Sequence, residues 1–212
     1  MLSSRGLLIT LEGGDGAGKT TQANLLYGYL AEQGLSCLLT REPGGTPIGE
    51  RIRELLLDRR YTEMVAECES LLYAAARAQH VRQVILPALD EGRVVLCDRF
   101  VDSSLAYQGY GAGVNLGFLR EVNRLATAGI VPHLTIVLDL DPVAGRQRGR
   151  IKDRIEHRDL AFHRRVRNGF LALAREEPQR MVVIPAEPPP EEVHRQVLAA
   201  VERLLERWAF RP

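Results

Sequence analysis

A glycine-rich segment at 13–20 has the residue types and spacing of a phosphate-binding loop. Its sequence, GGDGAGKT, matches the pattern G-x-x-x-x-G-K-[ST] between an expected strand and an expected helix. Glycines let backbone N–H groups approach phosphate oxygens closely, and the helix N-terminus adds partial positive charge. The full match in this setting disfavours a glycine-rich turn that only caps a helix. Nucleotide phosphates are expected to contact Gly13, Gly14, Asp15, Gly16, Ala17, Gly18, Lys19, Thr20 and Thr21.

Three side chains of this loop have separate expected roles. Lys19 would neutralise β- and γ-phosphate oxygens, and Thr20 would offer its hydroxyl to Mg²⁺. Asp15 is less usual, because a carboxylate repels a nearby triphosphate. Its side chain therefore either points to solvent or binds a hydroxyl group or a cation.

Two arginines follow strands at the carboxyl edge of the expected sheet, where open α/β folds bind ligands. Asp98 and Arg99 follow the third strand, and Arg41 begins a loop with Pro43 after the second. An aspartate there can hold Mg²⁺ through water, and an arginine can bind a phosphate with two parallel hydrogen bonds. Two convergent arginines suit a second phosphate. The alternative is an Asp-Arg pair that only terminates a strand.

Polar and aromatic side chains nearby could read a base or a sugar. The segment 103–109 supplies hydroxyls, an amide and a ring through Ser104, Gln108 and Tyr107. Tyr73 and Arg77 are four residues apart in an expected helix, so both can face one cavity. The alternative for this pair is one core and one surface residue.

A dense basic run between 146 and 154 predicts a mobile lid over about 145–156. Five of its nine side chains are cationic, and only Asp153 interrupts them. Positive charges this close together repel one another unless an anion binds among them. This favours a flap that closes over ATP phosphates. Arg148, Arg150 and Arg154 are candidates for a catalytic cation beside the transferred group. The alternative is an exposed basic helix end.

Short apolar runs alternate with stretches of helical period, as in a parallel sheet covered by helices on both faces. The five expected strands span 7–12, 37–40, 94–97, 135–139 and 181–184. The expected helices span 20–33, 48–57, 67–91, 116–128, 142–148, 159–177 and 190–207. We therefore expect an α/β fold of the P-loop type with five parallel strands.

The composition bounds the functional class. A chain of 212 residues with 45% hydrophobic content is expected to form a single domain over 1–212. The net charge of +1 does not favour a nucleic-acid polymer as partner. Three cysteines without metal-ligand spacing indicate a reducing cytoplasm. The N-terminal apolar run is too short for a signal peptide or membrane span.

Together, these segments resemble the bacterial thymidylate kinases. The resemblance covers nearly the whole chain through EGGDGAGKTT (12–21), TREPGGT (40–46), YAAARAQH (73–80), DRF (98–100), AYQG (106–109) and DRIE (153–156). The REPGG and AYQG elements separate this family from adenylate and guanylate kinases. Three departures are Ala112 in place of a common arginine, a shorter lid, and Pro185-Ala186 after the last strand, which leaves the adenine contact open.

The resemblance implies ATP and dTMP as substrates, with Mg²⁺, and a homodimer that packs helices together. It assigns Asp15 to the 3′-hydroxyl of the deoxyribose, Arg41 and Arg99 to the dTMP phosphate, and Tyr107 to crowding the 2′ position. Tyr73 would stack on thymine, Arg77 would bond its carbonyl edge, and Ser104 and Gln108 would make further base contacts.

The expected reaction is direct in-line transfer of the γ-phosphoryl group of ATP to dTMP, as one step of dTTP synthesis. Lys19, Arg99 and the lid arginines would share the developing charge, because positioning and neutralisation carry most phosphoryl transfer. Two alternatives stay open at this stage. One is a kinase for another monophosphate such as dUMP, and the other is a P-loop switch or partner-binding ATPase, which needs no acceptor pocket.

Overall fold

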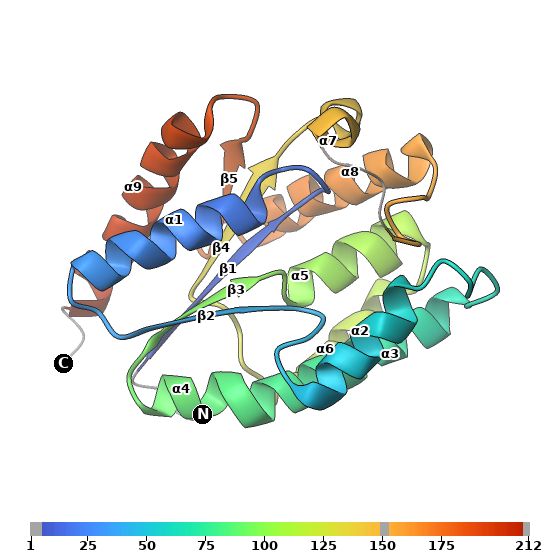
Figure 1. The fold of residues 1–212 in the computed structure, drawn as a ribbon, viewed down its shortest axis with the longest axis horizontal. Coiled ribbons are helices and arrows are strands. Elements are labelled where there is room, and N and C mark those ends of the chain that lie inside the picture. Colours follow the sequence, from blue (N-terminus) through green and yellow to red (C-terminus); the bar gives the residue numbers. More distant parts are fainter. Residues whose placement is uncertain (1–5, 149–152, 210–212) are drawn as a thin grey trace.

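The computed structural model describes residues 6–148 and 153–209, and a parallel sheet lies at its centre (Figure 1). Its strands, in spatial order β2-β3-β1-β4-β5, confirm the expected five-stranded sheet. They are β1 (Leu7–Gly13), β2 (Cys37–Arg41), β3 (Val94–Asp98), β4 (Leu134–Asp139) and β5 (Met181–Pro185). Because β1 pairs with both β3 and β4, the loop that follows it opens at the middle of the carboxyl edge.

Helices cover both faces of this sheet. One face carries α1 (Lys19–Glu32) and α9 (Pro190–Ala209), which bury Leu26, Leu30 and Val197 against the strands. The other face carries α4 (Leu86–Asp90), α5 (Val101–Ser104) and α8 (Leu160–Glu176). Strands buried on both sides are continuous apolar runs, which is why they could be recognised in the sequence.

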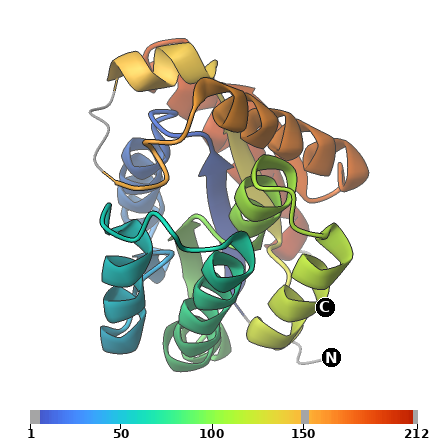
Figure 2. The same ribbon diagram turned by 90° about the vertical axis from the view of Figure 1, so that its right-hand side faces the viewer.

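Three further helices pack against one another. Figure 2 shows α2 (Pro47–Leu57), α3 (Ala66–His80) and α6 (Leu116–Ala126) side by side, with α3 packed between the other two. Helix α7 (Pro142–Arg148) lies above the carboxyl edge of the sheet (Figure 1). Thr46 and Asn115 cap α2 and α6 by accepting hydrogen bonds from backbone amides, which explains where these helices begin.

Two segments with π-helical hydrogen bonding were not foreseen. The expected helix at 67–91 is α3 followed by η1 (Val81–Ile85) and α4. The chain from 101 to 111, for which no helix was expected, forms α5 and η2 (Leu105–Gly111). Its serines and glycines are weak helix formers, but Gly111 lies directly against Phe162 and Val166 of α8. Tertiary packing therefore decides the conformation of this segment.

Across the described ranges, no helix combines the length and the apolar character needed to cross a bilayer.

Candidate active site

The loop between β1 and α1 has the backbone expected of a phosphate cradle. Gly13, Gly16 and Gly18 all have positive φ angles, of 133°, 75° and 87°. A side chain on Gly13 would collide with the carbonyl of Leu138 on β4, so only glycine fits there. Gly18 precedes α1, and no side chain caps this helix. Its first amide groups are thus available to an anion.

Lys19 is buried at the start of α1, and its Nζ donates a hydrogen bond to Gly14 O over 2.7 Å. Burial and the nearby Arg99 lower the pKa of Lys19 to about 8, although Asp15 and Asp98 oppose this shift. The ammonium group is thus held where it is poorly solvated. Such a cation gains strongly from an anionic ligand.

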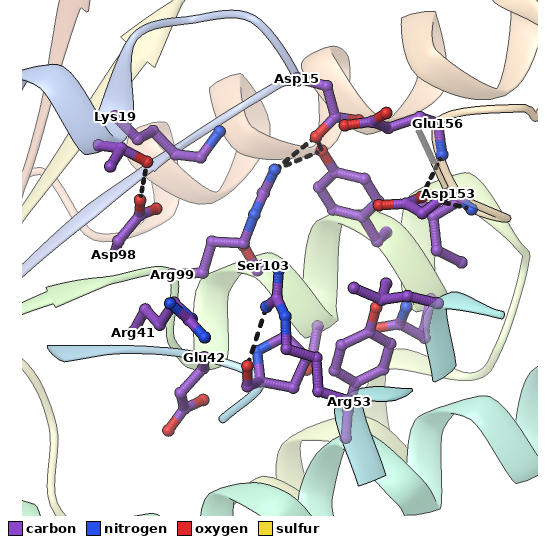
Figure 3. A pocket seen from close by; sticks show the side chains of 18 of the residues that line it. Asp15, Lys19, Arg41, Glu42, Arg53, Asp98, Arg99, Ser103, Asp153 and Glu156 are labelled. Carbon is purple, nitrogen blue, oxygen red and sulfur yellow. Dashed lines mark hydrogen bonds and ion pairs between the residues drawn. The ribbon is translucent and has the colours of Figure 1, made fainter. Parts of the chain in front are cut away.

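A cavity of about 300 Å³ opens beside this loop at the carboxyl edge of the sheet (Figure 3). It brings together residues from the loops after β1, β2 and β3 with residues of α3 and η2. The sequence-predicted residues that line it are Asp15, Gly16, Lys19, Thr20, Arg41, Pro43, Tyr73, Arg77, Asp98, Arg99, Ser104, Tyr107 and Gln108. All nine residues expected to contact dTMP are therefore among its walls.

Asp15, Arg99 and Tyr107 form a hydrogen-bonded cluster in the wall of the cavity, and Figure 3 shows the side chains of Asp15 and Arg99 directed toward each other. Arg99 Nη2 donates to Asp15 Oδ1 over 2.6 Å, and the hydroxyl of Tyr107 donates to the same oxygen over 3.0 Å. Although burial acts to raise the pKa of Asp15, Arg99 and Lys19 lower it below its ordinary value. The carboxylate is therefore ionised. Of the two alternatives left open by the sequence, exposure to solvent or binding of a hydroxyl group or a cation, the structure shows the second.

The backbone of Arg99 is itself unusual. Its φ angle of 69° lies in the left-handed region, which non-glycine residues rarely adopt. Its Nη1 also donates to Gly13 O and to Ser103 Oγ, over 3.1 and 3.2 Å. The guanidinium is thus fixed by the phosphate loop and by α5 together, and it faces the cavity with a defined orientation.

Thr20 and Asp98 provide two oxygen atoms suited to a hard cation. Thr20 Oγ1 donates to Asp98 Oδ2 over 2.6 Å, at the wall shared with Lys19. Hydroxyl and carboxylate oxygens are the protein ligands that Mg²⁺ prefers, usually with several water molecules. The donor set therefore fits this cation.

Arg77 is held rigidly on the opposite side of the cavity. Its side chain is 2% exposed, and its Nε donates to Glu42 Oε2 over 2.7 Å. Its other nitrogens donate to Ser104 Oγ and Phe100 O, each over 3.0 Å, and to Asn123 Oδ1. This anchoring leaves the guanidinium no freedom to turn away from the cavity that it lines with Tyr73.

Glu42 also belongs to a buried group with His80 and Cys97 whose potential metal-ligating atoms lie within 4.8 Å of one another. Protein contacts already engage these atoms. His80 bonds Glu42 through Nδ1 and Thr40 through Nε2, and Cys97 Sγ donates to Arg99 O over 3.1 Å. The group is thus better explained as support for Arg77 than as a metal centre.

Arg41 lies at the mouth of the cavity, where its Nη2 pairs with Glu50 over 3.1 Å. Arg53 was missed in the sequence analysis. Its Nη1 donates to Pro43 O over 2.9 Å, and its side chain lines the cavity, whereas Arg51 points to solvent and pairs with Glu54. The arginine pattern of α2 could have indicated a basic face, but only packing shows which arginine faces inward.

Two of the lid candidates, Arg148 and Arg154, do not line the cavity. Arg148 donates to Ala186 O and Glu187 O, over 2.7 and 3.0 Å. Arg154 is buried against α2 and α3, where it donates to Leu56 O over 3.1 Å and to Glu69 Oε2 over 2.7 Å. Arg150 lies outside the described residues. The catalytic role of each arginine remains a prediction.

Glu69 is a second residue near the cavity that was not expected from the sequence. It is fully buried and accepts hydrogen bonds from Gln108 Nε2, Arg154 Nη2 and Arg158 Nη2, over 2.9, 2.7 and 3.1 Å. One carboxylate thus joins the η2 wall of the cavity to the end of the expected lid. Its position four residues before Tyr73 on α3 was the available signal. Ser103, Asp153 and Glu156 also line the cavity.

Comparison with known proteins identifies the family. The sequence model described as thymidylate kinase matches residues 11–197. The chain belongs to the thymidylate kinase family. It is 56% identical to a thymidylate kinase of Pelotomaculum thermopropionicum over 96% of both chains, and 53% identical to one of Deinococcus radiodurans over 93% of this chain and 97% of that one.

A crystal structure of the family shares the fold as well. The thymidylate kinase of Ehrlichia chaffeensis superposes with a TM-score of 0.79 at 35% identity, covering 92% of this chain and 98% of that chain. The resemblance expected from the sequence is therefore confirmed. Membership of the family makes the chain a kinase of nucleotide biosynthesis that phosphorylates dTMP to dTDP, and it implies the use of ATP.

The lowered pKa of Lys19 predicts how ATP binding depends on pH. Bound phosphates raise the pKa of the lysine, so binding above pH 8 takes up one proton. The affinity for ATP is expected to fall by up to about tenfold per pH unit above that point. Calorimetric titration in two buffers of different ionisation enthalpy measures the proton uptake. Lys19→Met should abolish this dependence, and an unchanged pH profile in that variant would contradict the assignment.

Proposed function

We propose that this chain transfers the γ-phosphoryl group of ATP directly to dTMP within the cavity, without a covalent enzyme intermediate. The observation that supports this most strongly is the shared wall: Lys19 and Thr20 of the phosphate loop line the same cavity as Arg99, Tyr73 and Arg77. A donor phosphate on the loop and an acceptor phosphate near Arg99 would then lie end to end. In-line displacement requires this arrangement.

The acceptor is proposed to occupy the part of the cavity between β3 and α3. Arg99 and Arg41 would bind its phosphate, with Asp15 on the 3′-hydroxyl and Tyr107 against the 2′ position. Tyr73 would stack on thymine, with Arg77, Ser104, Gln108 and Pro43 around it. Arg77 supports this assignment, because its protein partners hold one orientation toward the cavity.

Charge neutralisation would supply most of the rate. The transferred group carries negative charge on three oxygens, and pre-oriented cations stabilise it without reorganisation. Lys19 and Arg99 are both held inside the cavity wall, so they are the proposed cations of the loop and the strand edge. One of Arg148, Arg150 and Arg154 would join them from the lid.

Mg²⁺ is proposed to bind at Thr20 and Asp98, the latter directly or through water. When bound, this cation would neutralise charge on the β- and γ-phosphate oxygens. Thr20 Oγ1 and Asp98 Oδ2 lie 2.6 Å apart, which suits ligation of one ion by both residues or of its water shell.

Asp98→Asn is expected to raise the Mg²⁺ concentration needed for half-maximal activity by about tenfold or more. The amide oxygen of asparagine can still accept the hydrogen bond of Thr20, so mainly the negative charge is lost. Initial rates over a Mg²⁺ titration at saturating ATP measure the shift. An unchanged titration midpoint would place the ion elsewhere.

The function is tested by measuring ADP release with and without acceptor. With dTMP present, release should rise by orders of magnitude, and dTDP should form in equal amount. A switch ATPase would ignore dTMP, and a kinase for another monophosphate would prefer dUMP or a purine acceptor in the same assay. Either result would overturn the proposal.

A homodimer is proposed through the layer of α2, α3 and α6. Each helix carries exposed apolar side chains at helical spacing: Ile48 and Leu55 on α2, Leu71 and Ala75 on α3, and Phe118 and Leu125 on α6, with Ile52 and Val122 half-buried between them. Exposed apolar side chains on three helices that pack side by side support an interface between copies of this chain.

Leu125→Asp is therefore expected to convert a dimer to a monomer in light-scattering chromatography at micromolar concentration. A buried charge without a partner strongly disfavours association. Leu25→Asp on α1 is the control, since Leu25 is also an exposed leucine and lies on the other side of the sheet. Equal effects of the two substitutions would contradict this interface.

Residues 1–212 are proposed to act as one domain, because the described helices pack around one sheet or on its covering layer. A cytoplasmic location is proposed on the basis of three free thiols, including the exposed Cys68.

A further inference from the structure

A small cavity behind the phosphate loop is surrounded by polar atoms that lack partners. Of four buried side-chain atoms without a hydrogen-bond partner among the described residues, three belong to residues that line it. They are Asp15 Oδ2, Arg146 Nε and His163 Nε2, and the cavity measures about 50 Å³. His163 is only 8% exposed. Buried polar atoms are normally satisfied, so this clustering indicates a bound molecule.

Close packing explains why these three residues meet. A side chain on Gly16 of the loop would collide with the backbone of Gly145 on α7, and a side chain on Gly145 would collide with the carbonyl of Asp15. Arg146 therefore emerges beside the loop, where its Nη2 donates to Arg158 O. His163 reaches the cavity from the first turns of α8, which Asp159 caps.

The other carboxylate oxygen of Asp15 is already engaged. Asp15 Oδ1 is already bonded to Arg99 and Tyr107, so Oδ2 is left toward the cavity. Oδ2 lies 3.7 Å from His163 Nδ1, which is too long for a hydrogen bond. A direct contact between the carboxylate and the imidazole thus does not satisfy either group.

The three atoms define the chemistry of the bound molecule. Arg146 Nε donates a hydrogen bond, Asp15 Oδ2 accepts one, and the imidazole nitrogen of His163 does either. The wall carries two carboxylates, of Asp15 and Glu156, and two guanidinium groups, of Arg146 and Arg167, so charge favours neither an anion nor a cation. The bound molecule is therefore neutral and both donates and accepts hydrogen bonds. A cavity of this volume with three polar partners suits an ordered water.

Burial lowers the pKa of His163 and Arg146 reinforces the shift, while Asp15 and hydrogen bonding to the backbone of Glu156 and Arg158 oppose it. The imidazole is thus neutral at neutral pH and can bond a water molecule.

We propose that an ordered water in this cavity joins Asp15, His163 and Arg146, and that His163 thereby positions the loop carboxylate for the 3′-hydroxyl of dTMP. The inference rests on the proposed role of Asp15 in acceptor binding. It makes His163 a positioning residue, and it connects the acceptor-binding carboxylate to α7, from which the expected lid begins.

The test compares His163→Leu and His163→Gln on two acceptors, dTMP and its 3′-deoxy analogue. Leucine removes the polar atom, so kcat/KM for dTMP should fall about three- to tenfold, as for loss of one hydrogen-bonded link. The analogue has no 3′-hydroxyl to be positioned, so its kcat/KM should stay within about twofold. Glutamine can still bond the water and should retain most activity. Equal losses on both acceptors, or equal losses in both variants, would overturn the proposal.

Asp15→Asn separates this inference from the function on which it rests. A loss on dTMP that is larger than the loss on the analogue supports the role of Asp15. If Asp15→Asn is selective and His163→Leu is not, only the inference fails. If Asp15→Asn affects both acceptors equally, the assignment of Asp15 itself fails. His194→Leu, at a half-buried histidine that bonds Gln22, controls for loss of an imidazole and should leave both acceptors unchanged.

A high-resolution crystal structure of the unmodified chain gives a reading that does not depend on any variant. A water within hydrogen-bond distance of Asp15 Oδ2, Arg146 Nε and His163 Nε2 is expected. A dry cavity, or a direct hydrogen bond between His163 and Asp15, would refute the proposed site.

Discussion

Lys19→Met should lower kcat by about a thousandfold or more while the fold is retained. The ammonium group is held at the start of α1 by Gly14 O and faces the cavity where the β- and γ-phosphates are proposed to lie. Methionine has a similar length but no charge, so mainly the stabilisation of the developing phosphoryl charge is lost. Steady-state rates of dTDP formation at saturating substrates measure the effect.

Stability provides the control for this variant. The pKa of Lys19 is lowered to about 8 in the fold, below its ordinary value, so the charged lysine destabilises the folded state at neutral pH. Removing the charge should therefore leave the thermal midpoint unchanged or slightly higher. A rate within a few-fold of the parent, with a normal melting curve, would refute the role of Lys19.

Arg99→Lys should lower kcat/KM for dTMP by about a hundred- to a thousandfold. The guanidinium uses both terminal nitrogens to contact Gly13 O, Ser103, Asp15 and Tyr107, and a lysine cannot reproduce this fork. A φ of 69° costs lysine and arginine the same conformational free energy. The substitution therefore reports only on the loss of the guanidinium group. Kinetics with dTMP varied at fixed ATP measure the loss.

Arg41→Lys is the comparison for this prediction. Arg41 lies at the exposed mouth of the cavity and pairs with Glu50. Its replacement should therefore lower kcat/KM for dTMP by only about tenfold. The two variants should thus differ by at least one order of magnitude. Equal losses would mean that the acceptor phosphate lies at the mouth rather than beside Arg99.

The sheet and the phosphate loop could be predicted because their signals are local. Strands such as Leu7–Gly13 and Val94–Asp98 are buried on both faces, so their sequences are nearly continuous apolar runs. The loop after β1 needs glycines at three positive φ angles, and these appear directly in its pattern. The residues expected around dTMP line one cavity because parallel strands end at a common edge.

Other features depend on contacts between distant segments. Arg154 was expected among the lid cations, yet it is buried against Glu69, 85 positions away in the chain. The helical conformation of 101–111 depends on packing against α8, and the inward direction of Arg53 depends on the loop at Pro43. No local pattern encodes these contacts, because each partner is far away in the sequence.

The order of strands along the chain, the phosphate loop and the set of side chains able to bind two nucleotides can all be read from the amino-acid sequence. The pairing of those side chains appears only in the folded chain: Asp15 with Arg99 and Tyr107, Thr20 with Asp98, and Glu69 with Gln108 and Arg154. Burial explains this difference. Inside the protein each charged group must find a partner, and which partner it finds depends on packing between elements rather than on neighbours in the chain.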